Sequence, residues 1–196
     1  AQWILWLEDF FGLPKASFTS DLLDRFCEAN TKQTFMNVVP SIEKLLKPLK
    51  DSCRSYCFGL YSASIALSGV VLDSLQILLW EMQGLKIKNA ELTKKQTEII
   101  FGKSFERIES ARRIQILHTF SWITDSQKDD FERIRNIRNR YIHPWRASFK
   151  NEKTESLECY RIAFRLFREI TAVKIKDAGS IEVNPLLIKW MNKQKW

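Results

Sequence analysis

Three residues near one another in the chain, Arg138, Asn139 and His143, carry side chains suited to cleaving RNA without a metal. In that reaction the 2′-hydroxyl loses a proton and attacks its own phosphate, and the leaving 5′-oxygen gains a proton. The imidazole of His143, with an ordinary pKa of about 6.5, can perform either proton transfer at neutral pH. The guanidinium of Arg138 stays charged and can stabilise the phosphate, while Asn139 can hydrogen-bond one ring nitrogen and fix its tautomer.

A helix from about 125 to 142 is predicted to position these three residues. Its apolar residues recur at spacings of three and four, which places one stripe on one face: Phe131, Ile134, Ile137 and Tyr141. Pro144 disfavours helical angles at His143, so the helix should end within about one residue of it. Asn139 and His143 then share a face of the last turn, and the long side chain of Arg138 reaches the same opening.

This Arg-Asn pair, followed by a His at a helix end, resembles the signature of the HEPN superfamily, in which four to six residues separate an Arg from a His. Here the spacer runs from Asn139 to Ile142. Other segments are similar to the mannitol-repressor-like branch of that superfamily, and together with the signature they span roughly residues 60–170: Ile137–Asn139, Ser148 and Phe149 downstream, Val71–Leu75 and Ser104–Ile108.

The resemblance implies an all-α, up-and-down helical bundle and a catalytic set of Arg138, Asn139 and His143. HEPN ribonucleases join two copies of the signature across a dimer interface and leave 2′,3′-cyclic phosphate and 5′-hydroxyl ends. We therefore expect a homodimer through the signature helices, an RNA substrate, a toxin or phage-defence role, and an antitoxin or regulatory partner domain. The mannitol-repressor-like features favour an alternative, a non-catalytic regulator or scaffold that dimerises through the same residues.

One position departs from the HEPN toxins that pair with a nucleotidyltransferase antitoxin. Those toxins often carry a modifiable Tyr two residues after the His, whereas this chain has Trp145. Without that hydroxyl, control by modification is not expected here.

Basic and aromatic residues around the signature form a candidate RNA-binding set: Arg135, Arg140, Trp145 and Arg146. Guanidinium groups bind phosphates, and aromatic rings stack on bases. A structural explanation has equal weight, because the helix dipole favours basic side chains at any helix C-terminus.

The 196-residue chain has the composition of a globular protein, with 45% hydrophobic and 28% charged residues. Few breakers (6 Gly and 5 Pro) favour long helices, and the net charge of +8 favours polyanionic partners. Four scattered cysteines, Cys27, Cys53, Cys57 and Cys159, indicate free thiols in a reducing cytoplasm. We expect no cofactor, no metal site and no membrane span, since the apolar run 57–82 contains serines and acids.

Three parts are predicted along the chain: an N-terminal helical extension (1–55), the bundle (56–178) and a C-terminal helical tail (179–196). The apolar, acidic segment 2–12 favours docking on its own domain or a partner over a membrane anchor. Further helices are expected over 17–30, from 40 with a break at Pro48, and over 56–83, 89–100, 104–122, 154–175 and 184–196. Small residues in the 56–83 helix should let a neighbour approach closely: Gly59, Ala63, Ala66 and Gly69. Asp73 and Glu81 either face solvent or pair with a nearby arginine such as Arg138.

Overall fold

The computed structural model describes residues 2–29, 40–88, 90–142, 151–171, 174–175 and 181–193. The predicted all-α class is confirmed, and the helices are α1 Gln2–Phe11, α2 Ser20–Ala29, α3 Pro40–Cys57, α4 Tyr61–Gln83, α5 Lys94–Phe101, α6 Ser110–Thr119, α7 Asp125–Ile142, α8 Glu152–Thr171 and α9 Pro185–Lys193. Two short antiparallel hairpins join them, β1 Lys86–Ile87 with β2 Ala90–Glu91 and β3 Lys174–Ile175 with β4 Ile181–Glu182. Single 3-10 turns lie at Lys15–Ser17 and Phe105–Arg107.

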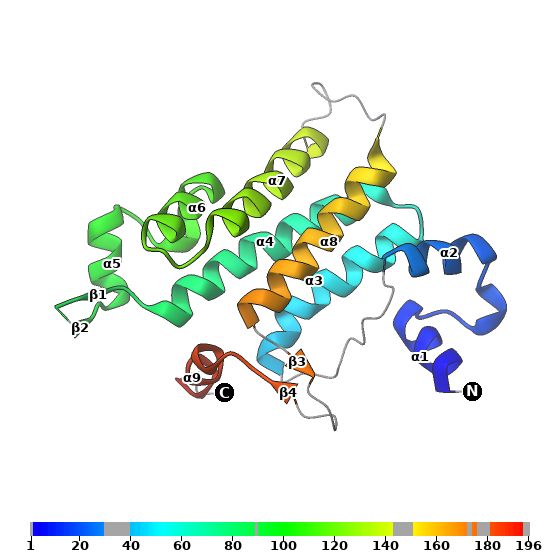
Figure 1. The fold of residues 1–196 in the computed structure, drawn as a ribbon, viewed down its shortest axis with the longest axis horizontal. Coiled ribbons are helices and arrows are strands. Elements are labelled where there is room, and N and C mark those ends of the chain that lie inside the picture. The colour runs from blue at the N-terminus through cyan, green and yellow to red at the C-terminus, as the bar shows by residue number, and fades with distance from the viewer. Residues whose placement is uncertain are drawn as a thin grey trace.

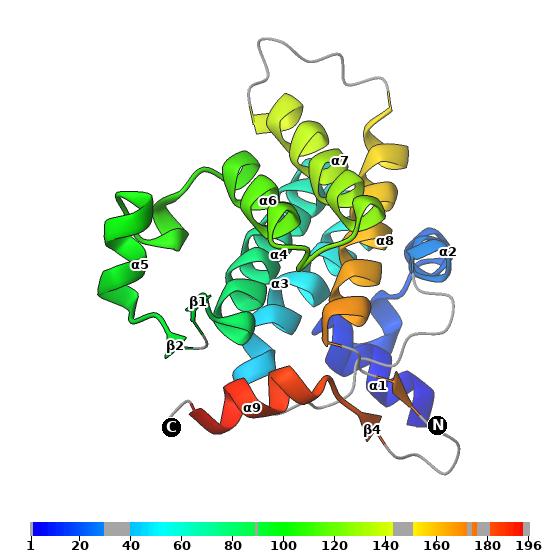
Figure 2. The same ribbon diagram turned by 60° about the vertical axis from the view of Figure 1, so that its left-hand side comes forward.

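Helix α4 is the centre of the bundle, and α3, α7 and α8 pack along it (Figures 1 and 2). The core is apolar and fully buried on each of these helices, as at Leu49 of α3, Leu75 of α4, Ile134 of α7 and Leu166 of α8. Helix α6 lies beside α7, while α5 projects at one end and α1 and α2 lie at the other (Figure 1). Helix α3, most of which belongs to the predicted N-terminal extension (1–55), therefore shares one core with the helices of the predicted bundle.

The helix predicted over 56–83 begins later in the structure, at Tyr61, so its predicted start is wrong. Helix α3 ends at Cys57, and Gly59 adopts a φ of 77° in the turn before α4. A positive φ suits glycine, so Gly59 serves a turn and not helix packing. Helix α3 also continues through Pro48, where a break was predicted. Burial of its leucines at about 1.5–3 kcal/mol each outweighs the roughly 3 kcal/mol cost of an internal proline.

Hydroxyl groups, more than alanines, allow α3 and α4 to approach each other. Ser52 hydrogen-bonds the hydroxyls of Ser64 (3.1 Å) and Ser68 (2.9 Å), and all three side chains are buried. Ala63 is exposed, whereas Gly69 is buried as expected of a small packing residue. The predicted close approach of a neighbouring helix to α4 is therefore present, and Ser64 and Ser68 make it against α3.

Other predicted helices differ from the structure at their ends. The hairpin β1–β2 occupies the start of the predicted 89–100 helix, and α5 begins after Thr93, which forms a capping box with Gln96. The predicted 104–122 helix divides into a 3-10 turn and α6. Helix α9 starts as predicted, because the side chain of Asn184 accepts from the Leu186 amide at 3.0 Å.

The N-terminal segment docks on its own chain. Leu7, Phe10 and Phe11 of α1 are buried, and the rings of Phe10 and Phe11 contact Phe26 of α2 at 5.6 Å. Within the described residues, α4 alone has the length and apolar composition to cross a membrane. More than half of its apolar window is buried inside the bundle, which is the situation of a core helix.

Candidate functional site

Helix α7 is described from Asp125 to Ile142, the span over which the sequence predicts a helix. Its apolar stripe, Phe131, Ile134 and Ile137, is buried, which fixes the rotation of the helix about its axis. Arg138 and Asn139 therefore lie in the last turns, and both are half-buried. Three of the predicted site residues, His143, Trp145 and Arg146, lie outside the described residues.

An acidic residue of α4 holds the guanidinium of Arg138. Arg138 Nη1 donates to Asp73 Oδ2 at 2.8 Å, and Arg113 of α6 donates to the other oxygen of the same carboxylate. The side chains are 19% exposed for Arg138, 31% for Asp73 and 7% for Arg113. We call these three residues the Asp73 cluster. It joins α4, α6 and α7 in the interior, with Arg138 and Asp73 open to solvent.

Gly69, one turn before Asp73 on α4, makes room for the Arg138 side chain. A Cβ atom at Gly69 would lie 2.2 Å from Arg138 Cδ, far inside any real contact. The absence of a side chain there lets Arg138 cross α4 and reach the carboxylate. Gly69 is thus a steric requirement of the ion pair.

The Asp73 cluster carries one positive charge in excess, because a single carboxylate faces two guanidinium groups. Burial lowers the pKa of Arg113, Asp73 opposes that shift, and Arg138 adds to it. In the described part of the chain, the buried Nε atoms of Arg113 and Arg138 have no hydrogen-bond partner. An anion placed at the open side of Arg138 would be attracted by this excess charge.

The predicted RNA-binding arginines of α7 have different surroundings. Arg140 forms an ion pair with Glu155 of α8, which also accepts from the hydroxyl of Tyr141 at 2.7 Å. Burial and Glu155 together raise the pKa of Tyr141. Arg135 is half-buried, and its Nε has no partner among the described residues. Arg140 thus has a structural role in fastening α7 to α8, whatever else it contacts.

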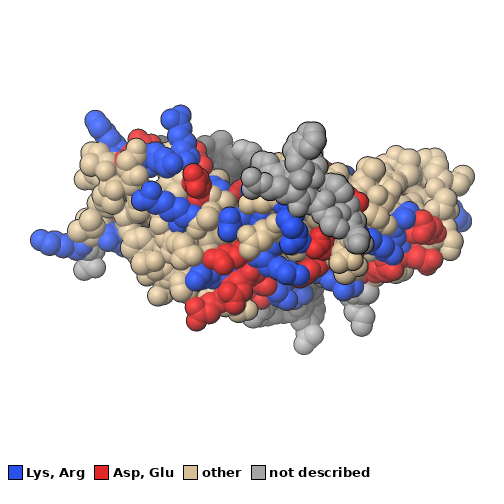
Figure 3. Space-filling view, turned by 90° about the horizontal axis from the view of Figure 1, so that it is seen from above, with Lys and Arg blue, Asp and Glu red and all other residues tan. Residues whose placement is uncertain are grey.

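Further charge pairs fasten the two helices along their length. Arg133 donates to both oxygens of Glu158 at 2.9 and 3.1 Å, and Arg165 donates to Asp130 at 2.6 Å. On the face seen in Figure 3, the Lys and Arg side chains of the described residues are interspersed with Asp and Glu side chains.

Three ionisable residues outside the signature have defined partners. Of the two alternatives left open for the acids of α4, Asp73 follows the pairing with Arg138, whereas Glu81 accepts from the indole Nε1 of Trp190 at 3.0 Å. His118 lies with Nε2 2.7 Å from Asp125 Oδ1, so this histidine is hydrogen-bonded within its own chain. Among the described residues, no three His, Cys, Asp or Glu side chains are grouped so as to hold a metal ion.

Sequence reasoning missed Arg113 and the steric role of Gly69. Arg113 lies 40 residues from Asp73 in the chain and next to another arginine, Arg112, so no local pattern distinguishes it. The position of Gly69 four residues before Asp73 was a usable signal, because the two share one helix face. Comparison of the chain with protein-family models, curated proteins and solved structures finds no match.

Proposed function

We propose that this protein is a metal-independent endoribonuclease of the toxin or phage-defence type, acting in a reducing cytoplasm as a homodimer. His143 transfers protons, Arg138 binds the scissile phosphate, and Asn139 orients the imidazole. The proposal rests on the sequence signature, and one structural observation carries it further. The guanidinium of Arg138 is held by Asp73 at 2.8 Å, in a cluster that retains one positive charge in excess.

The chemistry follows from the two side-chain types. One imidazole accepts the proton of the 2′-hydroxyl as the oxygen bonds to phosphorus, and a second imidazole donates a proton to the departing 5′-oxygen. The products are a 2′,3′-cyclic phosphate and a 5′-hydroxyl. Arg138 donates hydrogen bonds to the non-bridging oxygens, where negative charge develops. Because each chain supplies one histidine at the signature, the second comes from a twofold-related chain.

Holding Arg138 before substrate binds has an energetic advantage. A free arginine side chain loses rotamer freedom worth roughly 2 kcal/mol when it is immobilised, and this cost opposes catalysis. In the folded protein the ion pair with Asp73 and the space above Gly69 already hold the Arg138 side chain in place, so this entropy is lost on folding and not on substrate binding. The oriented donor then needs no rearrangement in the transition state.

A second function is favoured by a separate observation. Arg138 and Arg140 both form ion pairs with acids of their own chain, Asp73 and Glu155. Both guanidinium groups therefore have a partner without any substrate. That arrangement suits a non-catalytic HEPN-like regulator or scaffold, in which α7 mediates dimerisation and the cluster stabilises the fold.

Incubation of the purified protein with mixed RNA in excess chelator separates the two functions. The nuclease proposal predicts cleavage by the wild type and its loss in His143→Ala and in Arg138→Ala. Arg168→Ala, which removes an exposed arginine of α8, is the matched control and should cleave normally. Intact RNA with folded wild-type protein would reject the nuclease, and loss of the dimer in both signature variants would then favour the scaffold.

A further inference from the structure

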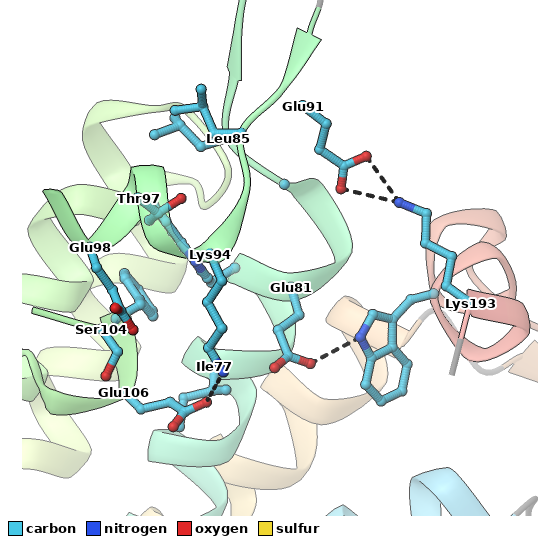
Figure 4. Close-up of a pocket in the computed structure, with 15 residues that line it drawn as sticks. Ile77, Glu81, Leu85, Glu91, Lys94, Thr97, Glu98, Ser104, Glu106 and Lys193 are labelled. Atoms are coloured by element: carbon cyan, nitrogen blue, oxygen red, sulfur yellow. Dashed lines mark hydrogen bonds and ion pairs between the residues drawn. The ribbon is translucent and has the colours of Figure 1, made fainter. Parts of the chain in front are cut away.

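A cavity of about 250 Å³, separate from the Asp73 cluster, lies where the end of α4 meets the β1–β2 hairpin, α5 and α9 (Figure 4). Its apolar walls include the rings of Trp80 and Trp190 and the side chains of Ile77, Leu85 and Leu92. Trp80 is fixed by stacking on Phe105, with ring centroids 4.2 Å apart. A concave surface with aromatic and aliphatic walls is the usual character of a small-molecule site.

The cavity is acidic in a basic protein. Its lining contains four carboxylates, Glu81, Glu91, Glu98 and Glu106, but only two ammonium groups, Lys94 and Lys193. The chain as a whole carries a net charge of +8. Among the residues that line the cavity, negative charges therefore outnumber positive ones, which favours a cationic ligand.

Two of these carboxylates, Glu91 and Glu106, pair with lysines of the same chain. Lys193 of α9 donates to both oxygens of Glu91 at 3.0 and 3.1 Å, and this contact lowers the pKa of Glu91. Gly84 permits the arrangement, because a Cβ there would lie 2.8 Å from Glu91 Oε1. Lys94 lies 3.8 Å from Glu106 on the opposite side. Each pair is an alkylammonium group on a carboxylate at the rim of the cavity (Figure 4).

The two remaining carboxylates have no such partner. In the described part of the chain, neither Glu81 nor Glu98 is paired with a lysine or arginine. Glu81 is instead oriented by Trp190, whose indole Nε1 donates to it at 3.0 Å. Both acids line the same cavity. A ligand with separate ammonium groups and an aliphatic middle would match carboxylates around an apolar interior, and the indole face would favour the cation further.

We propose that this cavity binds a small aliphatic diamine or polyamine, with its ammonium groups at Glu81 and Glu98 and its methylene chain against Trp80 and Trp190. This site is independent of the proposed nuclease activity.

Calorimetric titration of the full chain with 1,4-diaminobutane and with spermidine tests the site, and tryptophan fluorescence reports it independently. We expect saturable binding of one molecule per chain and a fluorescence change, because two indoles line the cavity. Glu81→Gln and Glu98→Gln should each weaken binding about tenfold, the equivalent of one lost charge-assisted contact. Glu81→Gln retains an oxygen that accepts from Trp190, so the cavity stays folded.

Two controls define failure. Asp24→Asn removes one exposed negative charge from α2 at the other end of the molecule and should bind like the wild type. The uncharged analogue 1,4-butanediol should not bind. Absence of saturable binding, equal weakening in Asp24→Asn, or equal binding of the diol would each overturn the proposal.

Discussion

Arg138 of α7 and Asp73 of α4 lie 65 residues apart in the chain, and their side chains meet at 2.8 Å. The other oxygen of the carboxylate binds Arg113, so one acid joins three helices. This contact sets the orientation of the Arg138 guanidinium near the end of α7. It also makes Asp73 the residue on which both the stability and the proposed chemistry of this region depend.

Replacing Asp73 with Asn should destabilise the protein by about 3 kcal/mol, because Arg113 would remain buried with its charge uncompensated. Urea unfolding measures this change in the free energy of unfolding. Asp24→Asn, at an exposed position, should stay within about 0.5 kcal/mol of the wild type. Equal unfolding midpoints for the two variants would show that the cluster does not stabilise the bundle.

Gly69→Ala should separate stability from activity. Alanine improves helix propensity by about 1 kcal/mol, but its Cβ would occupy the path of the Arg138 side chain. We expect a folded protein with little change in unfolding free energy and RNA cleavage reduced at least tenfold. Val70→Ala, at the exposed neighbouring position, should cleave normally, and normal cleavage by Gly69→Ala would contradict the positioning of Arg138.

Acid should remove a stabilising contact at Glu28. This carboxylate accepts from the Tyr56 hydroxyl at 2.7 Å and binds Lys153 at 3.0 Å, which lowers its pKa below 4.5. A lowered pKa gives stability that is present above pH 4.5 and is lost as the pH falls through the folded-state value.

The comparison variant for this contact is Glu28→Gln, which cannot ionise. Its free energy of unfolding should fall below that of the wild type at pH 7, by less than about 1 kcal/mol because Glu28 is half-exposed. The deficit should shrink at about pH 3, where the wild-type carboxyl is protonated. A deficit that is constant with pH would assign the effect to packing.

Thiol labelling should distinguish one cysteine from the other three. Cys27 is exposed, whereas Cys53, Cys57 and Cys159 are buried, and burial raises the pKa of Cys159 to about 12. At neutral pH we expect one fast-reacting thiol in the folded protein and four after denaturation. Cys27→Ser should abolish the fast reaction, and persistence of that reaction would show that the core opens readily.

Helix α7 was predictable because its signals are local. The apolar spacing of Phe131, Ile134 and Ile137, and the proline that follows the signature, define its face and its end without reference to other helices. For Asp73 the sequence left two alternatives open, exposure to solvent or pairing with an arginine, and only the structure selects the pairing with Arg138.

Three features that the sequence did not predict depend on packing between residues far apart in the chain. Pro48 stays within α3 because leucines on either side are buried by α4 and α8, a benefit invisible in the local pattern. Gly59 resembles a packing residue in the sequence, and only the turn between α3 and α4 reveals its positive φ. Arg113 joins the site through tertiary contact alone.

Cleavage of one RNA sequence in two chemical forms tests the central claim most directly. The purified protein is incubated in chelator with an unmodified RNA and with the same RNA bearing 2′-O-methyl groups throughout. Our account predicts that only the unmodified RNA is cut and that its fragments end in 2′,3′-cyclic phosphate. Equal cutting of both forms, or no cutting of either by the folded dimer, would contradict it.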